Sequence, residues 1–225
     1  MSDGLHSAGR RREAPVIGIT GNIGTGKSTV ARLLATLGAH VVDADQVVHR
    51  LYRDPESALV QAVAAEFGQD VLAQDGSLDR AALGKVVFND AAALRKLERI
   101  VHPAVVAAVR EDLDRTPPHV PFAIEAIKLI ESDLVVLLDV VWTVVAPPEL
   151  QRERLSAKGM SPEEAQRRLE MQPTVEDRIA QLRQKRGASC PVTRIANVGT
   201  FADLESTVQD LWGTMQAANP DTKEP

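Results

Sequence analysis

Hydrophobic positions follow two different periods along this chain, and each change of period marks a new element. Residues 16–20 form a continuous apolar and β-branched run, which is typical of a strand buried on both faces. From Val30 to Leu37 apolar residues recur at i, i+3, i+4 and i+7, which predicts an amphipathic helix that ends at Gly38. Residues 39–42, Ala-His-Val-Val, predict a second strand.

The next part of the chain, residues 46–118, is mostly helical in its pattern. Helices are predicted over residues 46–52, 57–67 and 91–100, and a further helix is predicted to begin after the capping residue Asp79. A last helix resumes after His102-Pro103 and ends before Thr116. Further along, strands are predicted over 121–125, 140–145 and 194–198, and helices over 147–155 and 201–215. Strands and helices therefore alternate along most of the chain.

This alternation predicts an α/β fold with a doubly wound, roughly five-stranded parallel sheet. We expect one domain over 15–216, with disordered tails at 1–14 and 217–225. Within the domain we distinguish a core made of 15–45, 119–150 and 190–216, a helical insertion over 46–118, and a lid region over 151–189. Ligands bind such sheets at the carboxyl ends of the strands.

Directly after the first predicted strand the chain reads Gly21-Asn-Ile-Gly-Thr-Gly-Lys-Ser28, which is the phosphate-binding loop of P-loop proteins in its expected context. Glycines let backbone N–H groups surround a polyphosphate, and the helix N-terminus adds positive potential. Lys27 reaches the β- and γ-phosphates and the Ser28 hydroxyl ligates Mg²⁺, so ATP and Mg²⁺ are the expected ligands. The predicted nucleotide-binding residues of the loop are Asn22, Gly24, Thr25, Gly26, Lys27, Ser28 and Thr29.

Two carboxylates, Asp43 and Asp45, follow the second predicted strand. In a doubly wound sheet this position lies beside the phosphate loop, where a carboxylate accepts a proton from an attacking hydroxyl or holds a Mg²⁺-bound water. The alternative is that one of them caps the next helix. Both roles are compatible because there are two carboxylates, and we favour Asp45 as the base.

The predicted lid region is rich in arginine, and closing arginines neutralise charge on a transferred phosphoryl group. These residues are Arg152, Arg154, Arg167, Arg168, Arg178, Arg183 and Arg186. The alternative is a solvated helix face on which arginines pair with neighbouring glutamates. His102 stands alone, without a second histidine at metal-ligand spacing, and is more often a structural hydrogen-bonding group than a catalyst.

Composition narrows the choice of partners and compartment. The 225 residues carry a net charge of −5, which argues against nucleic acid as the main partner. The single cysteine, Cys190, excludes an internal disulfide. The longest apolar stretch is too short to span a membrane, and no apolar segment follows Arg10-Arg11-Arg12 as it would in a secretory signal. We therefore expect a cytoplasmic protein without a membrane partner, and its oligomeric state stays open.

Together these residues resemble the dephospho-coenzyme A kinases, a family of small P-loop kinases, over nearly all of 15–212. The resemblance rests on the phosphate loop, Asp43-Ala44-Asp45, Asp75-Gly-Ser-Leu-Asp-Arg80, Val87-Phe88, Leu97-Glu98, His102-Pro103, Glu131, Arg154, Gly159-Met-Ser161, Arg168, Gln172, Asn197 and Gly199-Thr200. It implies transfer of the ATP γ-phosphate to the ribose 3′-hydroxyl of dephospho-coenzyme A, which is the last step of coenzyme A synthesis.

The resemblance also implies roles for single residues. Asp45 or Asp43 faces the acceptor hydroxyl, and Arg154 and Arg168 belong to the lid. Residues 197–200, which include Asn197 and Gly199, form part of the adenine site. The insertion containing His102 binds the acceptor, dephospho-coenzyme A.

The loop after the third predicted strand departs from the family. Where the family usually has Asp-x-Pro-Leu-Leu-x-Glu, this chain has Glu125-Ala-Ile-Lys128-Leu-Ile-Glu131, so Glu125 and Lys128 are candidate acceptor-binding residues of an unusual loop. The Lys128 side chain either contacts a phosphate of the acceptor or points to solvent. Lys158 also stands where the family commonly has arginine, and lysine lacks the bidentate geometry.

Three other functions share the phosphate loop. A regulatory GTPase requires an Asn-Lys-x-Asp motif, which this chain lacks. A kinase for another nucleotide or for a sugar has the same core and differs in the acceptor insertion. A degenerate ATP-binding scaffold is opposed by the presence of Lys27, Ser28 and both aspartates.

Overall fold

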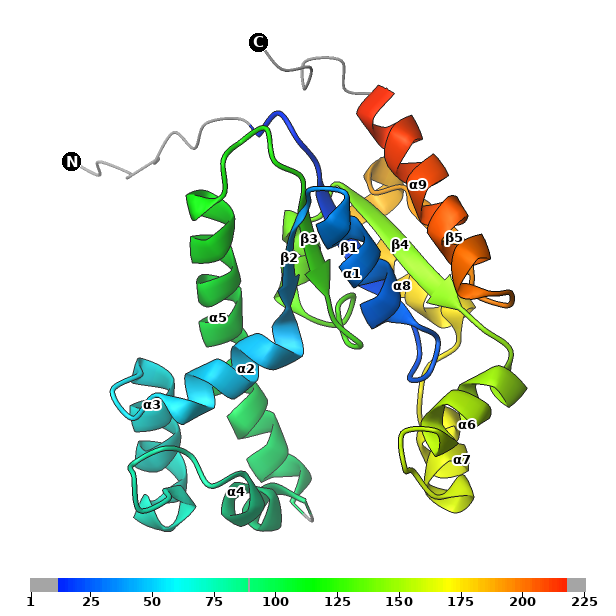
Figure 1. Ribbon diagram of the computed structural model, residues 1–225. Helices are drawn as coiled ribbons and strands as arrows, with labels where there is room; N and C mark the ends of the chain where they lie inside the picture. The colour runs from blue at the N-terminus through cyan, green and yellow to red at the C-terminus, as the bar shows by residue number, and fades with distance from the viewer. Residues whose placement is uncertain (1–11, 89, 218–225) are drawn as a thin grey trace, which may run out of the picture.

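A parallel sheet lies at the centre of the computed structural model, which describes residues 12–88 and 90–217. Within these residues the sheet has five strands in the order β2-β3-β1-β4-β5, and every neighbouring pair is parallel (Figure 1). The strands are β1 (Val16–Thr20), β2 (His40–Asp43), β3 (Phe122–Glu125), β4 (Val140–Val145) and β5 (Val192–Ala196). The doubly wound α/β fold predicted from the sequence is confirmed.

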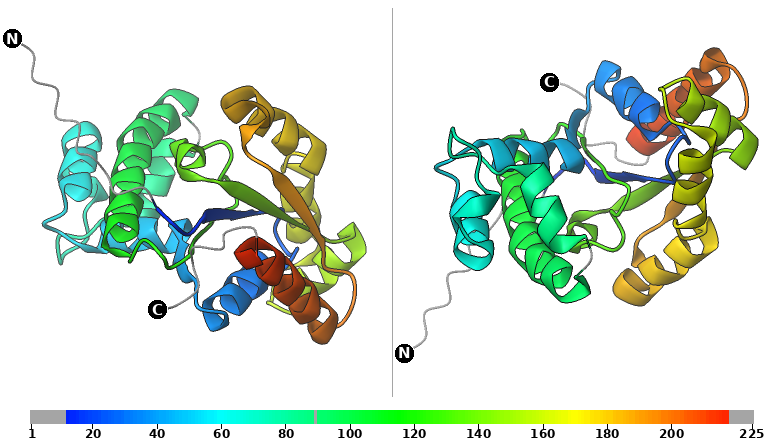
Figure 2. Two further views of the ribbon diagram at one scale, coloured as in Figure 1. Left: turned by 90° about the horizontal axis from the view of Figure 1, so that it is seen from above. Right: turned by 90° about the horizontal axis from the view of Figure 1, so that it is seen from below.

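Helices cover both faces of the sheet, as the two end-on views show (Figure 2). On one face, α1 (Lys27–Thr36) and α9 (Phe201–Ala217) pack their apolar sides against β1 and β4. On the other face lie α5 (Ala91–Arg115), α8 (Val175–Arg186) and the short 3-10 helix η2 (Asp133–Leu137). β1 is buried along its whole length because it is covered from both sides.

Two helical groups extend beyond the carboxyl ends of the strands, one on each side of the molecule (Figure 1). The first comprises α2 (Ala44–Arg53), α3 (Ala58–Phe67), the 3-10 helix η1 (Gln69–Val71), α4 (Arg80–Val87) and the start of α5. The second comprises α6 (Pro148–Ser156) and α7 (Pro162–Glu170), and α8 then leads through η3 (Gly187–Ser189) to β5. The carboxyl edge of the sheet therefore lies between two groups of helices.

The predicted insertion shares its core with the sheet. Val63 of α3 and Leu83 of α4 belong to the same hydrophobic cluster as Val109 of α5 and Phe122 of β3. The second half of α5 is thus a covering helix of the sheet, while its first half supports α2, α3 and α4.

The expected break at His102-Pro103 is wrong, because α5 continues through Pro103 over 25 residues. Proline has no N–H to donate to the carbonyl four residues earlier, but α5 keeps its apolar stripe on both sides of Pro103, and packing of that stripe stabilises one helix. Asp79 caps α4 as predicted, through its side chain and the backbone N–H groups of Ala81 and Ala82.

Three boundaries also differ from the sequence predictions. β5 begins two residues before the predicted Arg194 and ends at Ala196. Residues 12–14, assigned to the N-terminal tail, are placed against the domain: Arg12 donates to the backbone carbonyls of Leu113, Thr116 and Val120, and Ala14 is buried. Ala217, assigned to the other tail, is the last residue of α9. The remaining tail residues lie outside the described part of the chain.

Candidate active site

The turn between β1 and α1 is shaped by glycines with positive φ. Gly24 and Gly26 have φ of 77° and 98°, which other residues adopt only with strain. At Gly26 a Cβ atom would also lie 2.2 Å from Nδ2 of Asn197, so a side chain is excluded by space as well. Gly26 is directly followed by α1, whose first N–H groups lack partners within the helix. The turn thus presents backbone donors at a helix N-terminus, as an anion site requires.

Two residues of the turn, Asn22 and Thr25, stabilise its conformation through hydrogen bonds. The carbonyl of Asn22 accepts hydrogen bonds from Thr25 Oγ1 at 2.8 Å and from Lys27 Nζ at 3.0 Å. Thr25 is buried, and its own carbonyl accepts from Asn197 Nδ2 at 2.9 Å. Asn22 and Thr25 therefore organise the loop.

Lys27 is the buried cation of this site. Lys27 is only 7% exposed. This burial lowers the pKa of its ammonium group to about 8, although the Glu125 carboxylate opposes the shift. The nearby Arg178 lowers the pKa further. An incoming polyphosphate adds further negative charge beside this cation and therefore favours its protonated form.

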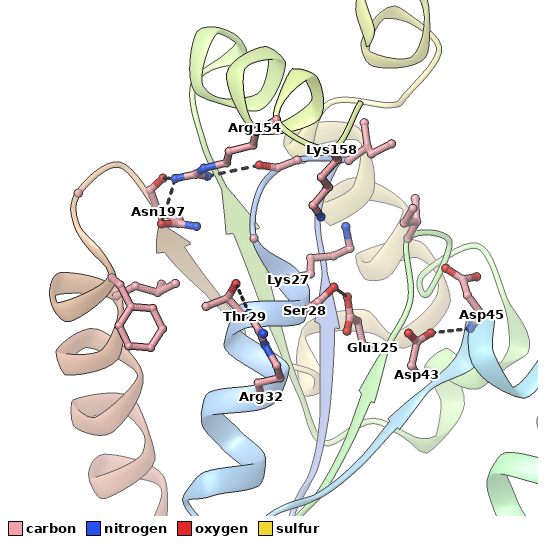
Figure 3. A pocket seen from close by; sticks show the side chains of 18 of the residues that line it. Lys27, Ser28, Thr29, Arg32, Asp43, Asp45, Glu125, Arg154, Lys158 and Asn197 are labelled. Carbon is pink, nitrogen blue, oxygen red and sulfur yellow. Dashed lines mark hydrogen bonds between the residues drawn. The ribbon is translucent and has the colours of Figure 1, made fainter. Parts of the chain in front are cut away.

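Three carboxylates gather on one side of the loop, where β2 and β3 end (Figure 3). Glu125 is the last residue of β3, and its Oε1 accepts a hydrogen bond from Ser28 Oγ at 2.9 Å. Burial raises the pKa of Glu125, and this hydrogen bond lowers it. Asp43 ends β2, and Asp45 lies in the first turn of α2.

Asp43 and Asp45 have different partners. Oδ1 of Asp43 accepts from the backbone N–H groups of Asp45 at 2.9 Å and of Gln46 at 3.2 Å, so Asp43 is the N-cap of α2. Asp45 does not cap this helix. Desolvation and the neighbouring Asp43 raise the pKa of its carboxyl, and Lys27 acts in the opposite direction. Of the pair, Asp45 is the one without a capping role.

A cavity of about 580 Å³, lined by several charged and polar side chains, opens over the loop, and we call it the polar cavity. Lys27, Ser28, Thr29, Asp45 and Lys158 line it, and Gly199, Thr200 and Phe201 line its far side. Arg154 of α6 also faces it and ties its walls together: its guanidinium donates to the carbonyls of Gly24 (3.3 Å), Thr25 (3.4 Å) and Asn197 (3.1 Å). The loop, α6 and the end of β5 are thereby joined at one edge of this cavity.

A second, largely apolar cavity of about 330 Å³ lies between α2, α5 and the segment after β3, and we call it the apolar cavity. Its apolar walls come from Val48, Val101, Val105, Val106, Ala126 and Leu134. His102, Lys128 and Ser132 supply its polar groups together with Asp45. Asp45 and Ile127 line both cavities, so the two spaces meet at these residues.

This arrangement can be compared with known proteins. The family model for dephospho-CoA kinase matches residues 15–183. A dephospho-CoA kinase of Moorella thermoacetica is 39% identical over 217 residues, covering 93% of this chain and 96% of the relative, and one of Geobacter sulfurreducens is 39% identical over 202 residues, covering 88% and 96%. The chain belongs to the dephospho-CoA kinase family.

A solved structure shares the fold over most of the chain. The crystal structure of TT1252 from Thermus thermophilus is 33% identical, has a TM-score of 0.68 and covers 89% of this chain and 97% of its own. Because the chain belongs to the dephospho-CoA kinase family, the two cavities described above are those of a kinase.

The structure places most of the sequence-predicted residues at the two cavities of this kinase. Gly24, Gly26, Lys27, Ser28, Thr29, Asp43, Asp45, Glu125, Arg154, Asn197 and Gly199 line the polar cavity, and His102 and Lys128 line the apolar one. Arg168 is not brought to either: its guanidinium pairs with Glu164 on the same helix, with an N–O distance of 2.6 Å and 51% of the side chain exposed. Lys128 forms a long ion pair with Glu98, 3.8 Å between Nζ and Oε1.

The support that Gln172, just before α8, and Arg178, in α8, give to the phosphate loop was not predicted from the sequence. Oε1 of Gln172 accepts from the N–H of Ile23 at 2.8 Å, and Arg178 is buried behind the loop. Arg178 appeared in the sequence only as one of several arginines. No local signal separated it from its neighbours, since its burial depends on where α8 packs.

The residues beside the loop suit a hard divalent cation. Ser28 and the nearby carboxylates offer oxygen ligands, which Mg²⁺ prefers, and Mg²⁺ in kinases takes only one or two protein ligands besides phosphates and waters. Within the part of the chain that the structure describes, no group of three histidine, cysteine or acidic residues forms a closed metal cage.

The described helices also include none long and apolar enough to cross a bilayer.

Proposed function

We propose that this family member transfers the γ-phosphoryl group of ATP to the ribose 3′-hydroxyl of dephospho-coenzyme A. The observation that carries the proposal is the meeting of the polar and apolar cavities at Asp45, in a chain of the dephospho-CoA kinase family. The polar cavity takes the nucleotide and the apolar cavity takes the acceptor. Their junction is where an acceptor hydroxyl and a γ-phosphate meet.

In the polar cavity the phosphates of ATP lie over the glycine turn. The N–H groups of Gly24, Gly26 and Lys27 bind phosphate oxygens, and the Lys27 ammonium neutralises charge that grows on the transferred group. The adenine lies beside residues 197–200, which form the wall opposite the carboxylates. Arg154 keeps this wall against the loop by its hydrogen bonds to Asn197 and Gly24.

Mg²⁺ is the proposed metal, with Ser28 as its ligand from the loop. A metal held there would supply positive charge beside the phosphates of ATP. Glu125 already accepts the Ser28 hydrogen bond, so we assign Glu125 to orienting this hydroxyl and holding waters of the metal. This role differs from the acceptor contact expected from its place in the family motif.

Asp45 is the proposed general base. It lines both cavities, and its pKa is raised above the ordinary value, which makes its carboxylate a better proton acceptor. Asp43 is occupied in capping α2 and thereby fixes the turn that carries Asp45. The proton of the acceptor hydroxyl passes to the carboxylate of Asp45 as the oxygen attacks the γ-phosphorus, and the bond from this phosphorus to the β-phosphate oxygen breaks, so that ADP leaves.

The acceptor binds in the apolar cavity, where valine and leucine side chains suit a base or an alkyl group. His102, Ser132 and Lys128 are the polar groups that orient it. Lys128 exchanges its weak contact with Glu98 for a phosphate of the acceptor. Arg168 reaches the phosphates only if α7 moves, so its lid role requires closure over both substrates.

The deciding experiment is a coupled assay of purified protein with ATP, Mg²⁺ and one of three acceptors: dephospho-coenzyme A, a nucleoside monophosphate or shikimate. We expect coenzyme A to form from the first and no transfer to the other two. Transfer to another acceptor without coenzyme A formation would retain the kinase class and reject the acceptor. Hydrolysis of ATP with no transfer to any of the three would reject the proposed function.

A further inference from the structure

Arg178 is the bulkiest fully buried side chain in the described part of the molecule, with 1% of its surface exposed. It projects from the first turn of α8 to a position behind the phosphate loop, where it contributes to the electrostatic environment of Lys27. A buried guanidinium is costly unless its donors are matched by acceptors. The identity of those acceptors therefore indicates what the side chain does.

Four acceptors from three segments surround the Arg178 guanidinium: the end of β1, the phosphate loop and residues 126–131, which we call the β3 loop. Nη1 donates to Thr20 Oγ1 at 3.4 Å, at the end of β1, and to the backbone carbonyl of Ile127, in the loop after β3. Nη2 donates to Asn22 Oδ1 at 3.2 Å, in the phosphate loop. Glu131, at the end of the β3 loop, lies 3.7 Å away between Nη1 and Oε1. One side chain thus links α8, the phosphate loop and the β3 loop.

The position of Ile127 gives this link its significance. Ile127 lines both the polar and the apolar cavity, and its carbonyl is held by Arg178 and also accepts from Thr20 Oγ1 at 3.3 Å. Any shift of this segment changes the wall between the cavities. We propose that Arg178 is a positioning residue that fixes the β3 loop, residues 126–131, against the phosphate loop, so that the acceptor hydroxyl is held in line with the γ-phosphate. This inference rests on the proposed function.

Stability alone is a poor explanation for this residue. Replacing a buried ion pair by apolar residues of similar volume is often neutral or stabilising. Moreover, Nε of Arg178 and Oε2 of Glu131 are buried without hydrogen-bond partners, and the Glu131 side chain as a whole is 30% exposed, so the two residues do not form an optimal buried ion pair. What the guanidinium provides is a planar set of donors that reaches several segments at once, and lysine lacks this geometry.

The test compares Arg178→Met and Arg178→Lys with the matched control Arg186→Met. Arg186 lies on the same helix and donates to the backbone carbonyls of Val136 (2.6 Å) and Leu138 (2.9 Å), outside both cavities. For each variant one measures the thermal unfolding midpoint, kcat, KM for ATP and for dephospho-coenzyme A, and the ratio of ATP hydrolysed to coenzyme A formed. That ratio separates positioning from stability, because a loose junction admits water.

For Arg178→Met we expect kcat to fall about 10- to 100-fold, as misplacement of reacting groups by about 1 Å does. KM for dephospho-coenzyme A should rise more than KM for ATP, and more ATP should be hydrolysed per coenzyme A formed. Arg178→Lys should recover only part of this loss. Arg186→Met should lower the unfolding midpoint and leave the ratio unchanged.

The proposal is overturned if folded Arg178→Met keeps the wild-type ratio and the wild-type KM for the acceptor, or if Arg186→Met changes the ratio equally. If Arg178→Met does not fold, Arg178→Lys and Glu131→Gln take its place, and wild-type ratios in both also overturn it. Failure of the proposed function is seen separately, since the wild-type protein then makes no coenzyme A. In that case the same ratio is measured with the acceptor that it does phosphorylate.

Discussion

The two cavities that meet at Asp45 are built in different ways. The polar cavity is formed around one short, continuous turn, and its function depends on backbone N–H groups, glycine conformations and one buried lysine. The apolar cavity is formed by α2, the middle of α5 and residues 126–134, which are far apart in the sequence. Phosphate binding is therefore encoded locally, whereas the choice of acceptor depends on how distant helices pack.

The same difference appears in the chemistry of the walls. Lys27 faces carboxylates that partly compensate its burial, so its charge is adjusted by several neighbours at once. In the apolar cavity the valines act by shape, and a few polar groups orient the ligand. Changes to the polar cavity should therefore affect kcat, and changes to the apolar cavity should affect KM for the acceptor.

The largest effect is expected for Lys27→Ala, which removes the buried cation of the polar cavity. Turnover should fall by about 10³-fold or more, because the charge that grows on the transferred phosphoryl group loses its nearest neutralising group. The measurement is kcat in the coupled assay, with circular dichroism to show that the fold is kept. Lys85→Ala on the exposed side of α4 is the control. Near-normal turnover in a folded Lys27→Ala protein would contradict the role of the loop.

Asp45→Asn tests the point that both cavities share. We expect turnover to fall by about 10² or more, the usual contribution of a general base, with little change in ATP affinity measured by calorimetry. Asp43→Asn is the matched control, since asparagine caps a helix about as well as aspartate and the capped turn should survive. A large loss in Asp43→Asn beside a small one in Asp45→Asn would reverse the two assignments.

Val48→Phe tests the apolar side alone. The larger side chain, on α2, fills part of the apolar cavity, so KM for dephospho-coenzyme A should rise about tenfold while KM for ATP stays unchanged. Val86→Phe, at a half-exposed position of α4 outside both cavities, is the control for adding an aromatic ring. An equal rise of both KM values would mean that the cavities are not separate binding sites.

Lys128→Ala should give the smallest effect. The side chain is 76% exposed and its contact with Glu98 is long, so stability should change by less than about 0.5 kcal/mol. KM for dephospho-coenzyme A should rise about threefold if an exposed cation–phosphate contact is lost. Lys96→Ala, which removes an exposed pair with Glu66 on the same helix group, is the control. An unchanged KM for the acceptor assigns Lys128 to solvent.

The same contrast explains how far the sequence alone predicts this molecule. The phosphate loop, β1 and β4 were predicted because each is specified by its own residues, through glycine conformation or a continuous apolar run. The continuity of α5 through Pro103 was not, since a local rule about proline was outweighed by packing on both sides of it.

In the candidate site, too, features that depend on tertiary packing could not be predicted from local sequence. The sequence left open which of Asp43 and Asp45 caps α2, and the backbone geometry identifies Asp43. Of the arginine-rich segment, Arg168 was singled out as a lid residue and Arg178 was not, yet Arg168 pairs with Glu164 on the surface and Arg178 is buried behind the loop. Burial of a single arginine depends on the tertiary arrangement, and the sequence pattern does not contain it.

The shared wall at Asp45 and Ile127 has a consequence for inhibitor design. A single compound with a polyphosphate arm for the polar cavity and an apolar arm for the apolar one needs only a short tether, because both cavities border the same two residues. Once one arm is bound, the other is held at an effective concentration in the millimolar range, so modest affinities of the two arms multiply. The selectivity of such a compound over other P-loop proteins would come from its apolar arm, because the phosphate loop is common to them, whereas the apolar cavity is formed by helices outside the loop.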